Sequence, residues 1–299
     1  MDVPARPAHL TERTSLLPAL NAWEAYLYDQ GRSPNTVKAF LSDVRLLTRF
    51  LAADHTLGAV TTDDLNRFFG WMEKQRGVPC SPKTLARRIT STKSFFRWLH
   101  KYGVLLIDPA EKVLQRSAIS PLPQTLTEEE YDAVLLAADR HRRDHKPDAR
   151  PYVLLSLLLA TGIKKSECLG IHLNHIDLDA SHGPQVFVRY ASAANRYKER
   201  KLALADDWIP AYEEYVSQYQ PIDQLFPWSP RRLEYLLEDT GEEAGLTKHL
   251  SFDICRWTSA LRDYQSGNDA DSVRQKLGVS KIQWREIQIK LRQLNGEID

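Results

Sequence analysis

The chain has 299 residues, 42% of them hydrophobic and 26% charged, which suits a globular protein of about two domains. Its three cysteines, Cys80, Cys168 and Cys255, are far apart and form no CxxC pair, which argues against a disulfide framework or a zinc site. The sequence does not begin like a signal peptide, and the longest apolar run, residues 152–163, is too short to cross a bilayer. We therefore expect a cytoplasmic protein with no membrane association, no metal and no cofactor.

The net charge of +1 hides an asymmetry between the two halves of the chain. Residues 1–118 hold 17 Lys/Arg against 11 Asp/Glu, a net charge of +6, whereas residues 119–299 hold 23 against 28, a net charge of −5. Such an asymmetry suggests that the first half of the chain faces a polyanion.

The first half reads as a small helical bundle. Residues 1–14 show no periodicity and are predicted to form a flexible tail. Apolar residues at helical spacing then predict four helices over residues 15–114, with no strand pattern between them. The four are a stretch over residues 16–30, one that starts at Ser33-Pro34, one from Thr61 to about residue 75, and one that starts at Ser81-Pro82.

The second half mixes helices with short strands. Residues 115–124 are predicted to form a linker, because this stretch is interrupted by two prolines. A capping box at Thr127 opens residues 125–299, which we predict to be mainly α with a small antiparallel β-sheet. The predicted elements are helices around residues 152–172, strands near 176–179, 185–190 and 198–204, and helices from Asp207 onward.

Four short motifs are the most informative part of the chain. They are Thr161-Gly162-Ile163-Lys164-Lys165-Ser166-Glu167, Lys198-Glu199-Arg200, Leu225-Phe226-Pro227 and Leu277-Gly278-Val279-Ser280. In this order and spacing, over roughly residues 15–290, they resemble the tyrosine recombinase (phage integrase) family. The resemblance implies an N-terminal SAM-like core-binding bundle, a C-terminal catalytic-like domain, and double-stranded DNA as the partner.

The same resemblance indicates that most of the catalytic residues are missing. Of the six catalytic positions, only Arg256 keeps the residue type that the family uses. The other five are Lys164 for an arginine, Asn195 for the hairpin lysine, Asp253 and Val279 for two histidines, and Gln288 for the tyrosine nucleophile. Lysine keeps the charge but lacks the planar fork that grips two phosphate oxygens. Asn195 cannot act as the acid, Val279 can neither donate nor accept a proton, and Gln288 is not a nucleophile for phosphoryl transfer. A carboxylate at Asp253 would repel a scissile phosphate, and Asp253 is expected to pair with Arg256 at i,i+3 on a helix.

The predicted DNA contacts come from both halves of the chain. Between Lys83 and Lys101 there are six cations and no acidic residue, which favours a DNA-facing helix over a merely solvated one. The resemblance would place six residues of the first half near the DNA backbone: Thr36, Lys38, Lys83, Thr84, Arg87 and Arg88. In the second half, the cations that could hold a phosphate are Lys164, Arg196, Lys198, Arg200 and Arg256.

Three functions follow as hypotheses. The first is a DNA-binding recombinase-like protein without catalysis, a pseudoenzyme that acts as accessory or regulator in site-specific recombination or of a mobile genetic element. The second is an active recombinase or integrase with a nonstandard nucleophile. The third is a protein-interaction module with little DNA affinity, which the acidic second half motivates. Its partner would be an active recombinase or a second copy, bound through the C-terminal helix.

Overall fold

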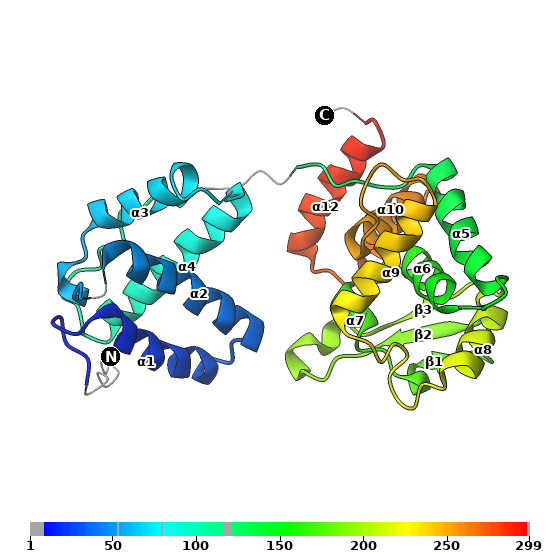
Figure 1. Cartoon of the computed structure of the whole chain (residues 1–299), viewed down its shortest axis with the longest axis horizontal. Coiled ribbons are helices and arrows are strands. Elements are labelled where there is room, and N and C mark those ends of the chain that lie inside the picture. The colour runs from blue at the N-terminus through cyan, green and yellow to red at the C-terminus, as the bar shows by residue number, and fades with distance from the viewer. Residues whose placement is uncertain (1–8, 53, 79, 116–120, 298–299) are drawn as a thin grey trace. The chain divides into compact units, whose positions relative to one another are not determined.

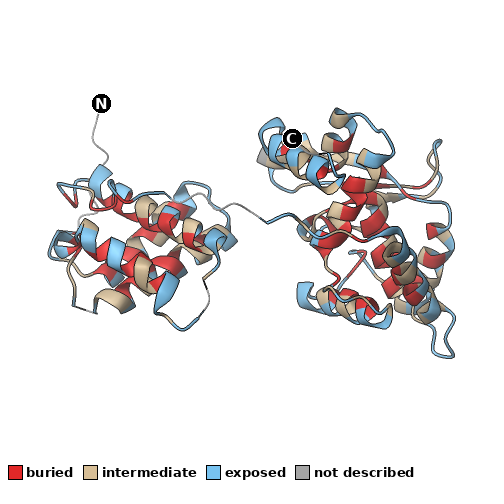
Figure 2. Cartoon of the chain, turned by 90° about the horizontal axis from the view of Figure 1, so that it is seen from above, coloured by how far each residue is buried: buried red, intermediate tan, exposed pale blue. Residues whose placement is uncertain are grey.

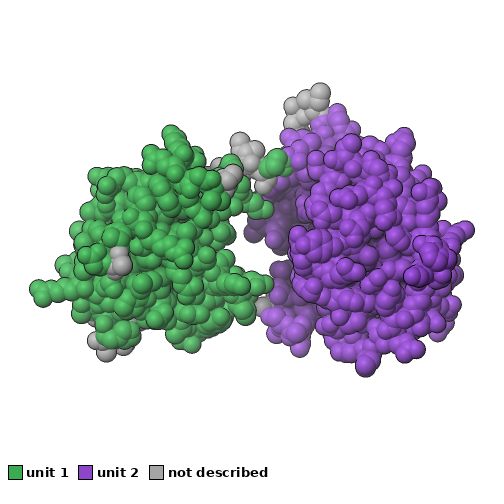
Figure 3. Space-filling model, in the orientation of Figure 1, with its two compact units in different colours: residues 1–121 green, residues 122–299 purple. Residues whose placement is uncertain are grey.

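The computed structural model describes residues 9–52, 54–78, 80–115 and 121–297. The chain divides into two compact units, Met1–Pro121 and Leu122–Asp299, each of which is described by itself (Figure 3). Their boundary falls inside the stretch predicted as a linker, of which residues 116–120 lie outside the described part. None of the helices in the described ranges combines the length and the apolarity that a membrane crossing requires.

The first unit is a helical bundle (Figure 1). Its elements are α1 (Leu16–Asp29), α2 (Pro34–Leu51), the short 3₁₀ helix η1 (Leu57–Ala59), α3 (Thr62–Lys74) and α4 (Pro82–Lys101). Ser33, Thr61 and Ser81 cap α2, α3 and α4, because each side chain accepts the backbone N–H three residues later. The three helices therefore begin where the sequence predicts.

An aromatic core holds the first unit together. Trp23, Phe68, Phe95 and Phe96 are fully buried, and red buried positions face the interior of the bundle in Figure 2. Leu10 is fully buried in the same core. The sequence predicted a flexible tail up to residue 14, but the segment around Leu10 packs on the bundle. The backbone N–H groups of Leu57 and Gly58 also donate to the carbonyls of Thr14 and Glu12, each at 2.8 Å, and fix this segment against the bundle.

The second unit is mainly helical and contains a small sheet (Figure 1). Its helices are α5 (Glu128–Arg142), α6 (Arg150–Thr161), α7 (Lys165–Cys168), α8 (Trp208–Tyr219), α9 (Pro230–Glu243), α10 (Phe252–Gln265), α11 (Ala270–Lys276) and α12 (Lys281–Leu294). The strands are β1 (Ile176–Asp177), β2 (Gln185–Val188) and β3 (Arg200–Ala203), with 3₁₀ turns η2 (Leu173–His175) before β1 and η3 (Ala193–Lys198) between β2 and β3.

Helix α6 is the centre of this unit. It is apolar on nearly every side and packs against α5, α8, α9, α10 and β3. The antiparallel sheet has the order β1-β2-β3, with Val186 opposite Leu202, and both side chains are buried. The chain leaves α6 through Gly162, whose φ of +60° gives the left-handed helix cap that glycine favours. After this cap, Ile163 is still buried in the core, and Lys164 is the first half-buried residue.

Candidate functional site

The predicted DNA contacts of the first unit lie on α2 and α4. Thr36 and Thr84 belong to the two serine caps: their backbone N–H groups bond the cap hydroxyls at 3.2 Å, and their own hydroxyls lie 2.9 Å from the same oxygens. These N–H groups are therefore already used within the protein. Lys38 and Lys83 are exposed, and neither forms an ion pair within the described residues.

Arg87 and Arg88 are committed to a buried carboxylate. Both guanidinium groups pair with Asp43 of α2, Arg87 through a close contact and Arg88 with its Nε 3.5 Å from Oδ1. Ser91 donates to the same carboxylate at 2.9 Å, and Arg88 also donates to the sulfur of Cys80 at 3.3 Å. We call Asp43, Arg87, Arg88 and Ser91 the Asp43 network. The stretch of α4 that lacks acids in the sequence is therefore partly neutralised by the neighbouring helix.

In the second unit, Glu167 is a buried hub. Its carboxylate accepts both Nη groups of Arg200, at 3.1 and 3.0 Å, the hydroxyl of Tyr190, and the backbone N–H of Lys164 at 2.8 Å. Burial opposes ionisation, but the bonds from Arg200 and Tyr190 outweigh it and hold the pKa of Glu167 below its usual value. Arg200, predicted to face DNA, is thus occupied inside the protein.

The Leu-Gly motif packs directly on Arg200. A Cβ atom on Gly278 would lie 2.5 Å from Nη1 of Arg200, so only glycine fits there. The Nε of the same arginine donates to the carbonyl of Lys276 at 2.6 Å. Gly278 is therefore needed for packing against Arg200, whether or not residue 279 has a chemical role.

Arg256 joins the other two motif segments. Its Nη1 donates to the carbonyl of Gly162, and its Nη2 donates to the carbonyl of Leu277 at 2.8 Å. No ion pair links it to Asp253 within the described residues, so the predicted i,i+3 pair is wrong. The backbone carbonyls occupy the guanidinium instead, and the carboxylate of Asp253 is exposed.

Lys164, Lys198 and Arg256 form a group of cations that we call the phosphate cluster. Within residues 121–297, none of the three pairs with a carboxylate. The ammonium group of Lys198 instead bonds the amide oxygen of Asn195 at 3.0 Å. Burial, followed by repulsion from Arg256, lowers the pKa of Lys164, and burial lowers the pKa of Arg256 to about 10, although the nearby Glu167 carboxylate favours both charges. The cluster holds positive charge for which the protein supplies no bonded anion.

The hairpin position predicted to have lost its function therefore has a structural use. Asn195 stands where the motif expects a lysine, and its side chain holds Lys198, three residues further along η3. Lys198 and Arg200 are the hairpin cations that act electrostatically on Lys164, whereas Arg196 is exposed and lines a different cavity. Successive side chains here do not point to opposite faces, as they would in a β-strand, because these residues lie in a 3₁₀ turn.

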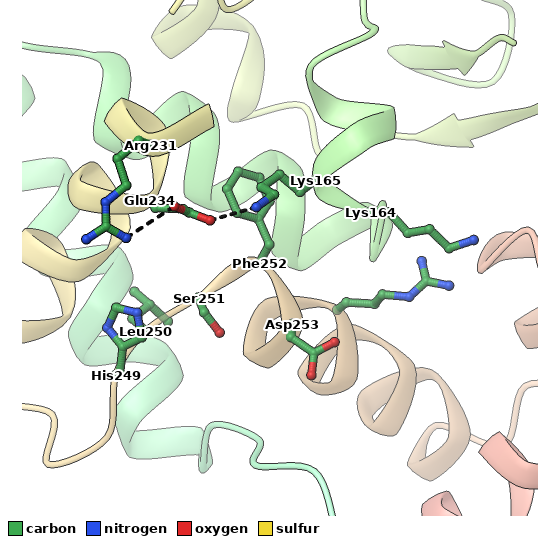
Figure 4. Close-up of a pocket in the computed structure, with 10 residues that line it drawn as sticks. Lys164, Lys165, Arg231, Glu234, His249, Leu250, Ser251, Phe252 and Asp253 are labelled. Atoms are coloured by element: carbon green, nitrogen blue, oxygen red, sulfur yellow. Dashed lines mark hydrogen bonds and ion pairs between the residues drawn. The ribbon is translucent and has the colours of Figure 1, made fainter. Parts of the chain in front are cut away.

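A cavity of about 360 Å³ opens beside this cluster (Figure 4). Lys165 turns toward Glu234 of α9, which it contacts at 2.6 Å, while Lys164 points in the opposite direction. Four cations and two carboxylates line the cavity, which leaves it net positive: Lys164, Lys165, Arg231 and Arg256 against Glu234 and Asp253. Glu234 forms ion pairs with both Lys165 and Arg231. Within the described residues, neither carboxylate of the cavity forms an ion pair with Lys164 or Arg256.

His249 also lines this cavity, although its place in the sequence argued against it. It precedes α10 in a loop, and its Nδ1 lies 3.6 Å from Glu238. The sequence places it four residues before Asp253, too far upstream for the expected histidine on a regular helix. Only the path of the loop reveals this proximity.

The two remaining lost positions lie on or before α12. Val279 is buried in an apolar cluster with Leu277 and Trp284, and Gln288 is half-buried on the helix. The last tyrosine of the chain, Tyr264, donates its hydroxyl to Glu297 at 3.1–3.2 Å. It lies eight residues beyond Arg256 on α10, or roughly 12 Å along the helix axis.

The comparisons with known proteins match this architecture. One family model, the phage integrase N-terminal SAM-like domain, matches residues 20–103, and a second, the phage integrase family, matches residues 124–287. The tyrosine recombinase XerC of Mycobacterium tuberculosis is 34% identical over 161 residues, 53% of this chain and 53% of that protein. That of Lacticaseibacillus casei is 28% identical over 287 residues, 89% of this chain and 91% of that protein. The chain thus spans about half the length of the mycobacterial relatives it matches.

Solved structures show the same fold at low sequence identity. A lambda integrase dimer bound to a COC′ core site matches with a TM-score of 0.71 and 15% identity, over 92% of this chain and 95% of that one. XerH bound to its difH substrate matches with a TM-score of 0.70 and 16% identity, over 98% and 90%.

Proposed function

Because the chain belongs to the phage integrase family, we propose that it binds double-stranded DNA and serves site-specific recombination as an accessory or regulatory protein that does not cut DNA. A mobile element that carries its own active recombinase would be a suitable setting. The proposal has two parts, DNA binding and the absence of cleavage, and they rest on different residues.

The phosphate cluster is the observation that carries the binding part. Two half-buried cations and a hairpin lysine are held together without a bonded carboxylate, although burial disfavours their charges. A DNA phosphate would supply the missing anion and would accept charge-assisted hydrogen bonds from Lys164 and Lys198. The exposed Lys38 and Lys83 of the first unit would add backbone contacts that increase affinity without reading sequence.

The absence of cleavage rests on the groups around that cluster. Covalent cleavage of a phosphodiester requires a nucleophile and a donor for the leaving oxygen. Gln288 is not a nucleophile for this reaction, Val279 is an apolar core residue, and Asp253 places a negative charge on the cavity. The hydroxyl of Tyr264 is bound by Glu297. We infer that phosphate is held but not attacked.

A nicked suicide substrate separates the two parts. Duplexes that tile the DNA flanking the gene would first be screened by gel shift, and the bound ones would be nicked so that any covalent product is trapped. We expect salt-dependent binding without a protein–DNA adduct on denaturing gels. A known tyrosine recombinase on its own target provides the positive control. An adduct would contradict the proposal.

The relatives' name favours a second candidate, an active recombinase with a nonstandard nucleophile. If an adduct forms, peptide mapping identifies the attacking residue, and the Tyr264→Phe variant shows whether the last tyrosine is responsible. Failure of any duplex to bind even at low salt would support the protein-interaction module instead.

Helix α12 is the candidate surface for a protein partner. Trp284 and Leu291 anchor it within its own unit, whereas Ile282 and Ile289 are 80% and 47% exposed. We propose that an active recombinase or a second copy contacts this exposed side. Replacing both isoleucines with aspartate should abolish co-elution with that partner and leave the melting temperature unchanged.

A further inference from the structure

The hairpin loop between β2 and β3 carries an exposed aromatic ring on a firmly held turn. Tyr197 of η3 is 71% exposed. The turn is anchored on its far side, because Glu199 accepts the backbone N–H of Tyr190 at 2.9 Å and Arg200 is bonded to Glu167. An aromatic side chain exposed this far on an ordered turn is positioned to contact another molecule.

This ring lines a cavity of about 270 Å³ against α11. Lys198, Gln275 and Val279 also line it, and the ammonium nitrogen of Lys198 lies 5.1 Å from the centre of the Tyr197 ring. Ligand pockets usually measure roughly 300–1,000 Å³, so this one suits a single planar ring system. It offers a stacking surface, a cation and an amide that can hydrogen-bond a base edge.

Three cations and one carboxylate line the cavity, and the carboxylate, Glu199, accepts the backbone N–H of Tyr190. Arg274 pairs with Asp271 at 2.8 Å and donates to the carbonyl of Val279 at 3.1 Å, and Arg200 is neutralised by Glu167. Lys198 bonds only a neutral amide within residues 121–297. Because Lys198 also belongs to the phosphate cluster, the cavity adjoins the site where a DNA phosphate would lie.

We propose that this cavity receives one base displaced from the bound duplex. The base stacks on Tyr197, and the adjacent phosphate is held by Lys198 and Lys164. The proposal rests on the proposed DNA binding and specifies the preferred DNA: a duplex that contains an unpaired base. Displacing a base costs least where pairing is already lost, so a mismatched duplex should bind more tightly than a matched one.

Affinities for paired substrates test this proposal. Fluorescence anisotropy would compare a matched duplex, taken from those that bind, with the same duplex carrying one mismatch moved base by base along the site. Stacking one base on an aromatic ring changes affinity by about 5- to 150-fold, so we expect a preference of this order at one mismatch position. Tyr197→Ala should lower the affinity for the mismatched duplex and remove the preference, and Tyr197→Phe should keep it.

Two controls make the result specific. Tyr28→Ala removes another exposed tyrosine, 48% exposed on α1, and should leave the preference intact. In addition, 2-aminopurine at the preferred position should lose fluorescence on binding to the native protein, because an aromatic ring quenches it, and should stay bright with Tyr197→Ala.

The possible results distinguish the base-binding cavity from DNA binding itself. If no duplex binds, both are overturned. If matched and mismatched duplexes bind equally, or if Tyr197→Ala retains the preference, the base-binding cavity is wrong while DNA binding stands.

Discussion

Two groups of cations, one in each unit, differ in whether the fold supplies them with an anion. In the first unit, the Asp43 network pairs two arginines with one carboxylate that is 2% exposed. In the second, the phosphate cluster gathers three cations with no carboxylate bonded to them. The first arrangement gives both arginines an anion within the fold, and the second leaves three cations to which a phosphate could bond, as proposed above. A count of basic residues in the sequence cannot distinguish the two.

The largest effect is expected in the Asp43 network. Replacing Arg87 and Arg88 together with alanine leaves Asp43 buried without a counter-charge, which should destabilise the first unit by about 3–5 kcal/mol. Urea unfolding of the full chain, monitored by tryptophan fluorescence, measures this loss of stability. A loss of DNA binding in this variant therefore reports unfolding. A change below about 1 kcal/mol would show that the network is not structural.

The phosphate cluster should respond in its affinity for DNA. Lys164→Met removes one charge-assisted hydrogen bond, and such bonds contribute about 1.5–3 kcal/mol, so duplex binding should weaken at least tenfold. Lys165→Met is the matched control, because its ammonium group already pairs with Glu234. Anisotropy titrations of both variants give the comparison. Equal losses would place the DNA on the Glu234 side of the cavity.

Exposed lysines of the first unit should change only the salt dependence. Lys38→Ala with Lys83→Ala removes two candidate phosphate contacts, which should reduce the slope of log affinity against log salt by about two. Unfolding free energy should stay within about 0.5 kcal/mol per substitution, because neither side chain is buried or paired within the described residues. An unchanged slope would remove this unit's lysines from the interface.

The smallest effect concerns pH. Because burial lowers the pKa of Lys164, the unfolded chain binds more protons than the folded one between that pKa and the ordinary lysine pKa of about 10.4. The native protein should therefore gain stability relative to Lys164→Met as pH rises through this alkaline window. A bound phosphate favours the protonated lysine, so DNA affinity should fall over the same range. Urea unfolding and anisotropy from pH 7 to 10 test both signs, and a flat difference between the two proteins would contradict them.

Sequence reasoning reached the family, the fold class and the helix starts, because these depend on local signals. Ser33, Thr61 and Ser81 each begin a helix by a cap that two or three neighbouring residues specify. The sequence did not predict which of the cationic side chains are paired within the protein and which are free to bind a ligand. Asp43 meets Arg87 only because two helices pack, 44 residues apart, and Asn195 holds Lys198 only because the hairpin makes a 3₁₀ turn.

The hub at Glu167 shows that a retained motif in a related sequence can reflect folding rather than catalysis. Its partner Arg200, the tightly packed Gly278 and the cap at Gly162 are motif residues with a structural role of their own. These residues therefore record how a polypeptide is held together, and a homologue found through them can be a nuclease or an inert companion. Assigning a reaction to newly sequenced members requires inspecting the positions where the resemblance expects the nucleophile and the proton donors, which here hold Gln288, Asn195, Asp253 and Val279.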